Sequence, residues 1–110
     1  MQMKERVEQV LGTFLERNKD YAVHAYIRNG VTGNTFADMI IPMDRSVELK
    51  REKFSVSGNI GHIKYCNGLS LFYDEILGCY EERDEYNQQI VYIFLKNGMK
   101  IEFDCVGMSL

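Results

Sequence analysis

The sequence predicts an α+β fold, in which one N-terminal helix packs on a bent antiparallel sheet or small barrel of six to eight short strands. Two patterns support this prediction: an amphipathic stripe over residues 3–17, and alternation of apolar and polar residues through much of 21–106. A third observation is Asn97-Gly98, which stands between two apolar runs and favours a β-hairpin. The 110 residues contain no linker or low-complexity tract, so we expect a single domain over residues 1–110.

Residues 3–17 carry apolar side chains at the spacing of one helix face. These side chains are Met3, Val7, Val10, Leu11, Phe14 and Leu15. Gly12 lies inside this segment, where a glycine costs about 1 kcal/mol relative to alanine. Asn18 is suited to end the helix.

Three segments between residues 21 and 57 are strand candidates. The alternation over 21–28 predicts a strand, and so does the segment 35–41, which Pro42 would end. Residues 44–57 are compatible with a short capped helix or with a strand. The alternation that continues into Phe54 favours the strand, with Val47 and Leu49 facing inward.

The segment from residue 61 to residue 89 predicts a second hairpin and a loop. A turn at Asn67-Gly68 would place Ile63 opposite Phe72 and Lys64 opposite Leu71. A tight reversal at Asp74-Glu75 would lead into a strand over 76–82, and the polar segment 81–89 would be an exposed loop. From Leu69 onward we therefore expect a meander of strands.

The C-terminal hairpin would follow from a two-residue turn at Asn97-Gly98. That turn predicts three pairs on one face, Phe94 with Ile101, Tyr92 with Phe103 and Ile90 with Cys105. The strand 90–95 is apolar on both faces, so we expect a central strand with a layer on each side. The helix stripe is the favoured cover for Val91, Ile93 and Leu95, and a second copy of the protein is the alternative.

Charge, hydropathy and cysteine content indicate which partners and which location the sequence favours. The net charge of −3 is spread along the chain, which disfavours nucleic acid as a partner. No apolar run approaches the roughly 20 residues of a membrane helix, and the first residues do not resemble a secretion signal. Cys66, Cys79 and Cys105 are odd in number and widely spaced, so we expect reduced thiols and a cytoplasmic location.

No motif in the sequence predicts catalysis, a cofactor or a metal. His62 and Cys66 stand four residues apart on a predicted strand, which places them about 13 Å from each other, too far to share one zinc ion. No spacing pairs a nucleophile with a base. The carboxylates of the polar loop are more typical of a solvated segment than of a catalytic pair. We therefore expect no catalytic, cofactor or metal residues, and a protein that is not an enzyme.

The sequence thus favours a non-enzymatic protein–protein interaction or assembly module, such as a small adaptor or inhibitor of bacterial or phage type. One candidate surface is an acidic group that would face a basic partner, formed by Glu81, Glu82, Asp84 and Glu85. The other is the apolar group Val91, Ile93 and Leu95, which would support a homodimer if left uncovered. The alternative function is a small-ligand-binding or enzymatic barrel with a pocket lined by tyrosines and histidines.

Overall fold

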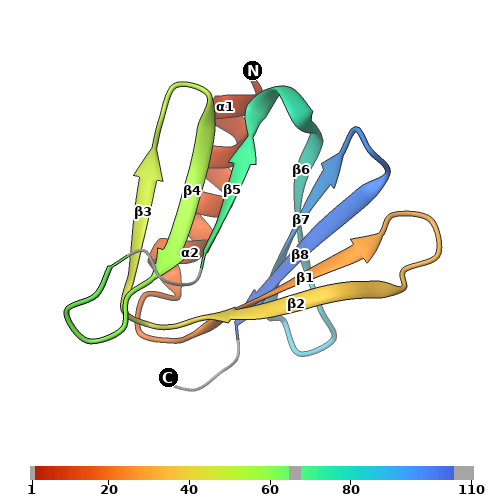
Figure 1. Cartoon of the computed structure of the whole chain (residues 1–110). Helices are drawn as coiled ribbons and strands as arrows, with labels where there is room; N and C mark the ends of the chain where they lie inside the picture. Colours follow the sequence, from red (N-terminus) through yellow and green to blue (C-terminus); the bar gives the residue numbers. More distant parts are fainter. Residues whose placement is uncertain (1, 65–67, 106–110) are drawn as a thin grey trace.

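The computed structural model describes residues 2–64 and 68–105 of the chain. One N-terminal helical segment packs on two antiparallel sheets, which stay open over these residues and do not close into a barrel (Figure 1). The α+β prediction is confirmed in its open-sheet form, with eight strands. The helical elements are α1 (Met3–Val7), the π-helical turn η1 (Glu8–Gly12), α2 (Thr13–Arg17) and the 3₁₀ turn η2 (Tyr73–Glu75). The strands are β1 (Val23–Asn29), β2 (Thr35–Ile41), β3 (Arg45–Leu49), β4 (Lys53–Gly58), β5 (Gly68–Phe72), β6 (Ile76–Arg83), β7 (Gln89–Leu95) and β8 (Met99–Cys105).

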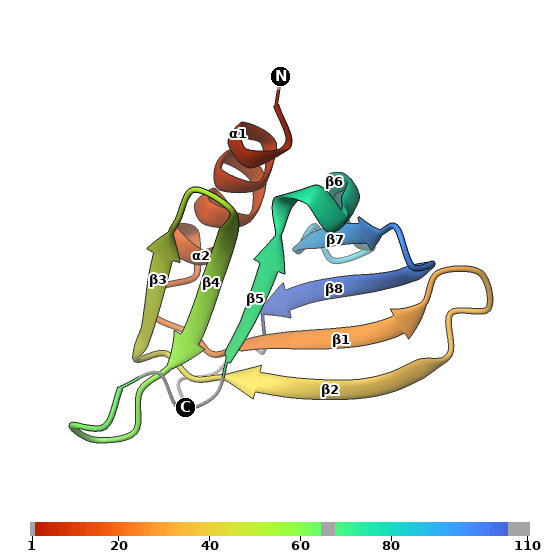
Figure 2. The same cartoon turned by 45° about the horizontal axis from the view of Figure 1, so that its top comes forward.

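The strands form a five-stranded sheet in the order β2-β1-β8-β7-β6 and a three-stranded sheet in the order β3-β4-β5. The chain crosses between the sheets twice, after β2 and after β5. In both cartoon views, the β1–β2 and β7–β8 turns project away from the three-stranded sheet (Figures 1 and 2). The inner faces of both sheets meet the helix, and the outer face of the five-stranded sheet lies on the far side.

The predicted helix over residues 3–17 is confirmed, and so is its apolar stripe. Val7, Leu11 and Phe14 are fully buried, and Val10 and Leu15 are nearly so. Asn18 ends the helix as expected, since both its backbone and its side-chain amide donate to the Phe14 carbonyl. The helix therefore closes one side of a single core that also includes Val23, Phe54 and Phe103.

The strand interpretation of residues 44–57 is also confirmed. β3 and β4 form a hairpin in which Val47 pairs with Val56 and Leu49 with Phe54. Val56 and Phe54 are buried, so Val47 and Leu49 share the inner face, as predicted. Both nevertheless remain exposed, because β3 is an edge strand.

The C-terminal hairpin exists, but its predicted register is wrong by one residue. Ile93 pairs with Ile101 and Val91 with Phe103, so the loop contains three residues, 96–98, and not two. Gly98 has a φ of 89° and donates its N–H to the Leu95 carbonyl, as in three-residue hairpin loops. The reason is burial: this register puts Val91, Ile93, Ile101 and Phe103 together on the core face.

The predicted hairpin at Asn67-Gly68 is wrong, and Asn67 itself lies outside the described residues. β5 pairs with β4, so Phe72 lies opposite Lys53 and Leu71 opposite Phe54, while Ile63 bridges to Ile60. Leu71 is thereby buried against Phe54, which a pairing with Lys64 would not provide.

Two further details of the C-terminal half differ from the sequence predictions. The meander begins at β6 and not at Leu69, because η2 takes the chain from β5 into the other sheet. The polar loop shrinks to residues 84–88, because β6 extends to Arg83 and β7 begins at Gln89. Polar residues 81–83 remain in a strand because edge strand β6 pairs there with apolar β7.

Candidate functional site

The outer face of the five-stranded sheet carries the most organised set of polar and aromatic side chains. We call it the outer face; it is formed by His24, Tyr26 and Arg28 on β1, Asp38 on β2, Tyr80 and Glu82 on β6, Tyr92 and Phe94 on β7, and Lys100, Glu102 and Asp104 on β8. On β1, β7 and β8 these residues alternate with side chains that face the core. Among the described residues, no helix or second sheet packs on this face, so the expected second layer over β7 is absent there.

The registers align the outer face into rows that cross the strands. One row contains Asp38, Tyr26, Glu102, Tyr92 and Tyr80. The next contains His24 opposite Asp104. Residues directly opposite each other in an antiparallel pair are close enough for their side chains to interact.

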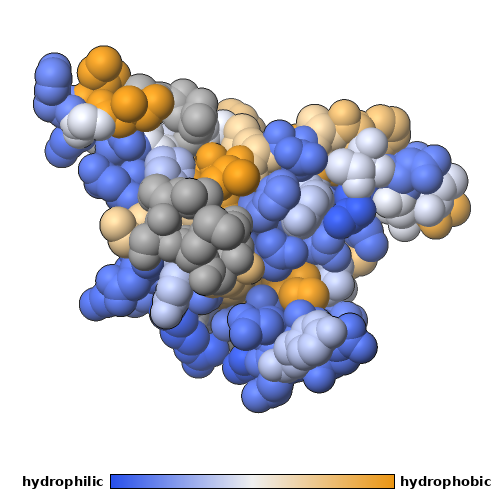
Figure 3. Space-filling view, turned by 90° about the horizontal axis from the view of Figure 1, so that it is seen from below, coloured by the Kyte–Doolittle hydropathy of each residue, from blue (hydrophilic) through white to orange (hydrophobic). Residues whose placement is uncertain are grey.

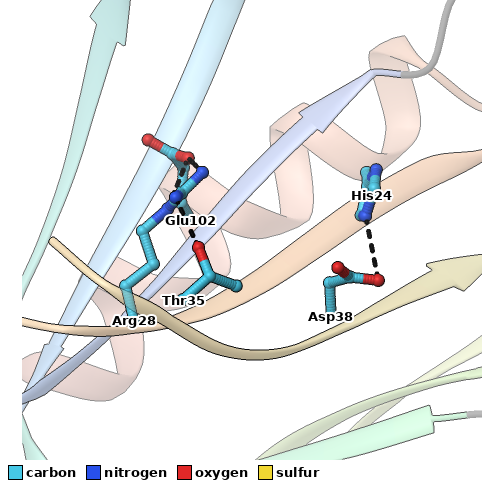
Figure 4. Close-up of polar contacts among 5 residues, drawn as sticks. All are labelled: His24, Arg28, Thr35, Asp38 and Glu102. Atoms are coloured by element: carbon cyan, nitrogen blue, oxygen red, sulfur yellow. Dashed lines mark hydrogen bonds and ion pairs between the residues drawn. The ribbon is translucent and has the colours of Figure 1, made fainter.

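Arg28 makes three side-chain hydrogen bonds on the outer face, near the β1–β2 turn (Figure 4). Its Nε and Nη2 atoms donate to Glu102 Oε2 at 3.1 and 2.8 Å, and Nη1 donates to Thr35 Oγ1 at 2.7 Å. The guanidinium carbon lies 4.5 Å from the centre of the Tyr26 ring. Arg28 and Glu102 are mostly buried, so this pair is a rigid element of the face.

His24 lies between two carboxylates. Its ring stacks on Tyr26 with 3.9 Å between ring centres, and its Nε2 atom is 3.5 Å from Asp38 Oδ1. That Nε2 atom is buried and makes no hydrogen bond within the described residues, so the contact with Asp38 is an ion pair only when His24 is protonated. Asp104, opposite His24, has its pKa raised, chiefly by burial.

The tyrosines of the face are held in a similar environment. Burial, followed by the charge of Glu102, raises the pKa of Tyr92 to about 12. Burial and the charge of Asp104 also raise the pKa of Tyr26. Both phenols therefore stay neutral at ordinary pH, and the Tyr92 hydroxyl donates a hydrogen bond to the Glu102 carboxylate.

A shallow hollow of about 400 Å³ lies where β6 meets β7, and its lining includes Tyr80, Tyr92, Phe94 and Lys100. Tyr80 contacts the edge of Phe94, with 5.8 Å between ring centres, and Lys100 Nζ lies 5.3 Å from the centre of the Tyr92 ring. Gly78 makes this arrangement possible, because a Cβ atom there would come within 2.5 Å of the Tyr80 ring.

The predicted acidic surface is only partly free. Glu81 accepts a hydrogen bond from Gln89, and Asp84 Oδ1 accepts the N–H groups of Tyr86 and Gln88 at 2.8 Å each. These two carboxylates thus hold the β6–β7 connection in shape. Glu82 and Glu85 are exposed, and only Glu82 belongs to the outer face.

The predicted apolar surface is mostly core. Val91 and Ile93 are fully buried with the helix stripe, so they are not exposed for self-association. Leu95 is half-buried and lines an apolar cleft of about 350 Å³ with Leu69, Phe72 and Met99. The cover that the sequence analysis favoured, the protein's own helix, is the one observed.

Among the described residues, the side chains that could bind a metal do not form a cluster. Among residues 2–64 and 68–105, no three His, Cys, Asp or Glu side chains come together in a way that would hold a metal ion. Cys79 is buried, and burial raises the pKa of its thiol to about 11. Cys66 lies outside the described residues. No helix in the described part of the chain combines the length and apolarity needed to cross a membrane.

Sequence reasoning missed the outer face because strand alternation shows which residues share a face but not which strands are neighbours. The pairing of β1 with β8, which are far apart in the sequence, brings His24 beside Asp104 and Arg28 beside Glu102. The available signal was the run His24, Tyr26 and Arg28 on the polar side of one predicted strand.

A comparison of the chain with protein-family models, with curated proteins and with solved structures gave no match.

Proposed function

We propose that this chain is a non-enzymatic protein-binding module, and that it holds a basic segment of its partner on the outer face. The observation that supports this most is the charge of the face: the carboxylates of Asp38, Glu82, Glu102 and Asp104 stand against the two cations Arg28 and Lys100. Arg28 is already paired with Glu102, so the remaining carboxylates outnumber the remaining cation.

The aromatic residues of the face support the same type of partner. Tyr80 is 52% exposed on this face and contacts the edge of Phe94 beside Glu82, so exposed ring surface and negative charge lie together there. Lysine and arginine side chains of a partner combine a positive charge with an apolar stem, which suits a surface of carboxylates and rings. The excess negative charge also disfavours nucleic acid.

A second argument for a binding role is that the ionised form of Asp104 lowers the stability of the fold. Burial raises its pKa, so the ionised carboxylate destabilises the fold relative to a neutral side chain. A charge held at the expense of stability is typical of a residue that serves binding.

The test is a titration of ¹⁵N-labelled protein with two synthetic peptides of equal length, one rich in Lys and Arg and one with Glu in their place. The basic peptide is expected to shift the amide resonances of β1, β7 and β8 saturably, and Asp104→Asn to weaken its affinity about fivefold, as loss of one charged contact of about 1 kcal/mol would.

Glu5→Gln is the matched control, because it removes the same charge from an exposed position on α1. Equal affinities of Asp104→Asn and Glu5→Gln would reject the outer face as the binding surface. Equal binding of both peptides would reject charge as its basis.

A small cationic ligand is the second candidate, favoured by the hollow beside Tyr80, Tyr92 and Phe94. Native mass spectrometry of the purified protein would show such a ligand as retained mass. A bare chain that still binds the basic peptide would favour the protein partner.

We propose the cytoplasm as the site of action, on the sequence argument of three widely spaced cysteines.

A further inference from the structure

The free edge of the three-stranded sheet is strand β3. The direction of its unused backbone groups follows from two hydrogen bonds to neighbouring segments. Lys50 donates its N–H to the Lys53 carbonyl, and the Asp44 carbonyl accepts the N–H of Asn59. Because alternate residues of an antiparallel strand direct their N–H and C=O groups to the same side, the even-numbered residues of β3 bond to β4. The backbone groups of Arg45, Val47 and Leu49 therefore point away from β4, toward the open edge.

An apolar groove of about 510 Å³ lies beside this edge, between β3 and the helical segment. Val47, Leu49 and Met43 line it and are 43%, 57% and 40% exposed. Its opposite wall combines Gly12, Thr13 and Leu15 with the charged residues Glu8, Glu16, Arg17 and Lys19. Edge strands are commonly protected by charges that point inward. On β3 the inward Arg45 is already bonded to carbonyls at the end of the helix, and the inward positions Val47 and Leu49 are apolar and exposed. A strand added at this edge would place its own inward side chains against the helix.

The sequence of β3 is complementary to itself in an antiparallel pairing centred on Val47. Val47 then faces Val47 of the second copy, Arg45 faces Leu49, and Ser46 faces Glu48. Just beyond the strand, Asp44 faces Lys50 of the second copy, and this oppositely charged pair occurs twice because the arrangement is symmetric. This register also joins the outward-pointing groups of the odd-numbered residues. A shift by one residue in either direction would misalign these groups, and a shift in one of the two directions would also place Arg45 opposite Lys50.

We propose that two copies of this chain associate through β3, with Val47 on the two-fold axis, to form a continuous six-stranded sheet. Val47 and Leu49 of each copy enter the groove of the other, and both helical segments lie on the same side of the sheet. The β3 edge belongs to the three-stranded sheet and the outer face to the five-stranded sheet. The test of the dimer is therefore independent of the binding function proposed above.

The test is the oligomeric state of the full chain by sedimentation velocity over a concentration series. The unaltered protein is expected to dimerise, and Val47→Lys is expected to raise the dissociation constant of the dimer at least about tenfold. Val31→Lys is the matched control, because Val31 is 94% exposed at the tip of the β1–β2 loop. It is expected to dimerise like the unaltered protein, and circular dichroism would show that both variants fold.

A charge exchange tests the register. Lys50→Glu is expected to weaken the dimer, since the new carboxylate would face Asp44 of the second copy, and the addition of Asp44→Lys is expected to restore it. A monomer at all concentrations up to about 1 mM would overturn the proposal. So would a dimer that Val47→Lys leaves intact, or a loss of association that the charge exchange fails to restore.

Discussion

At the scale of single residues, the outer face shows how burial and charge act on each other. Asp104 is a partly buried carboxylate with its pKa raised mainly by the loss of water, although His24 opposes the shift. Arg28 and Glu102, in contrast, meet at 2.8 Å and satisfy each other. Two carboxylates on the same strand thus have different surroundings, since Glu102 is paired with Arg28 and Asp104 lies opposite His24.

The pH dependence of the free energy of unfolding should show whether the ionised Asp104 carboxylate destabilises the fold. A raised pKa in the folded state means that the contribution of Asp104 to the free energy of unfolding is complete below the ordinary pKa of 3.8 and is lost as the pH rises through the folded pKa. Asp104→Asn removes this loss. We expect the variant to be more stable than the unaltered protein at pH 7 by less than about 1 kcal/mol, since the group is half exposed, and not at pH 3.

Urea denaturation at pH 7 and pH 3 would measure this difference, with Glu5→Gln as the control for removal of a solvated charge. A gain in stability together with weaker peptide binding would separate a binding role from a folding role. A loss of stability at pH 7 would contradict the assignment of Asp104 as a strained charge.

At the scale of elements, the C-terminal hairpin shows what a turn dipeptide can and cannot predict. Asn97-Gly98 does mark the turn, but the loop begins one residue earlier than a two-residue turn would allow. The strand 89–95 is apolar on both faces, so its own pattern does not choose a register. The choice follows from Ile101 and Phe103, which must join Val91 and Ile93 in the core.

The C-terminal turn requires a positive φ at Gly98, and this requirement can be tested by substitution. Its φ of 89° is disfavoured for residues with a Cβ, so Gly98→Ala is expected to lower the free energy of unfolding by about 1 kcal/mol or more. Gly12 has a helical φ of −59°, and a Cβ there would lie at an ordinary 3.9 Å from Phe54. Gly12→Ala is therefore expected to raise it by up to about 1 kcal/mol.

Chemical denaturation of the two variants would measure both effects. A loss of stability for Gly98→Ala and a gain for Gly12→Ala would agree with the positive φ of Gly98 and the helical φ of Gly12. A neutral Gly98→Ala would argue against the positive φ of Gly98.

At the scale of the whole molecule, Arg45 connects the helix to the sheets. From the start of β3 its guanidinium donates to four backbone carbonyls, at 2.7 Å to Tyr21, 2.8 Å to Asn18, 3.1 Å to Leu15 and 3.2 Å to Pro42. Burial lowers the pKa of Arg45. One side chain thus satisfies carbonyls at the end of the helix and joins them to the segment before β1 and to the crossing after β2.

Arg45→Ala is expected to lower the free energy of unfolding by about 2–3 kcal/mol, because it leaves several carbonyls without their donor. Arg45→Lys is expected to recover only part of this loss, since an ammonium group lacks the planar fork. Arg51→Ala, in the exposed β3–β4 turn, is the matched control and is expected to change stability by less than about 0.5 kcal/mol. Thermal denaturation would compare the three, and equal effects of Arg45→Ala and Arg51→Ala would contradict this role.

The local features can be predicted from the sequence: the helix over 3–17, its Asn18 cap, the strands over 21–28 and 35–41, and the position of the last turn. Each depends on residues close together in the chain, through periodicity, capping and turn chemistry. The hairpin register, the pairing of β5 with β4 and the contact of β1 with β8 are seen only in the three-dimensional structure, and so are the outer face and the four hydrogen bonds of Arg45. These depend on which distant apolar faces are buried together, and strand alternation, which is the same for every possible neighbour, does not contain that information.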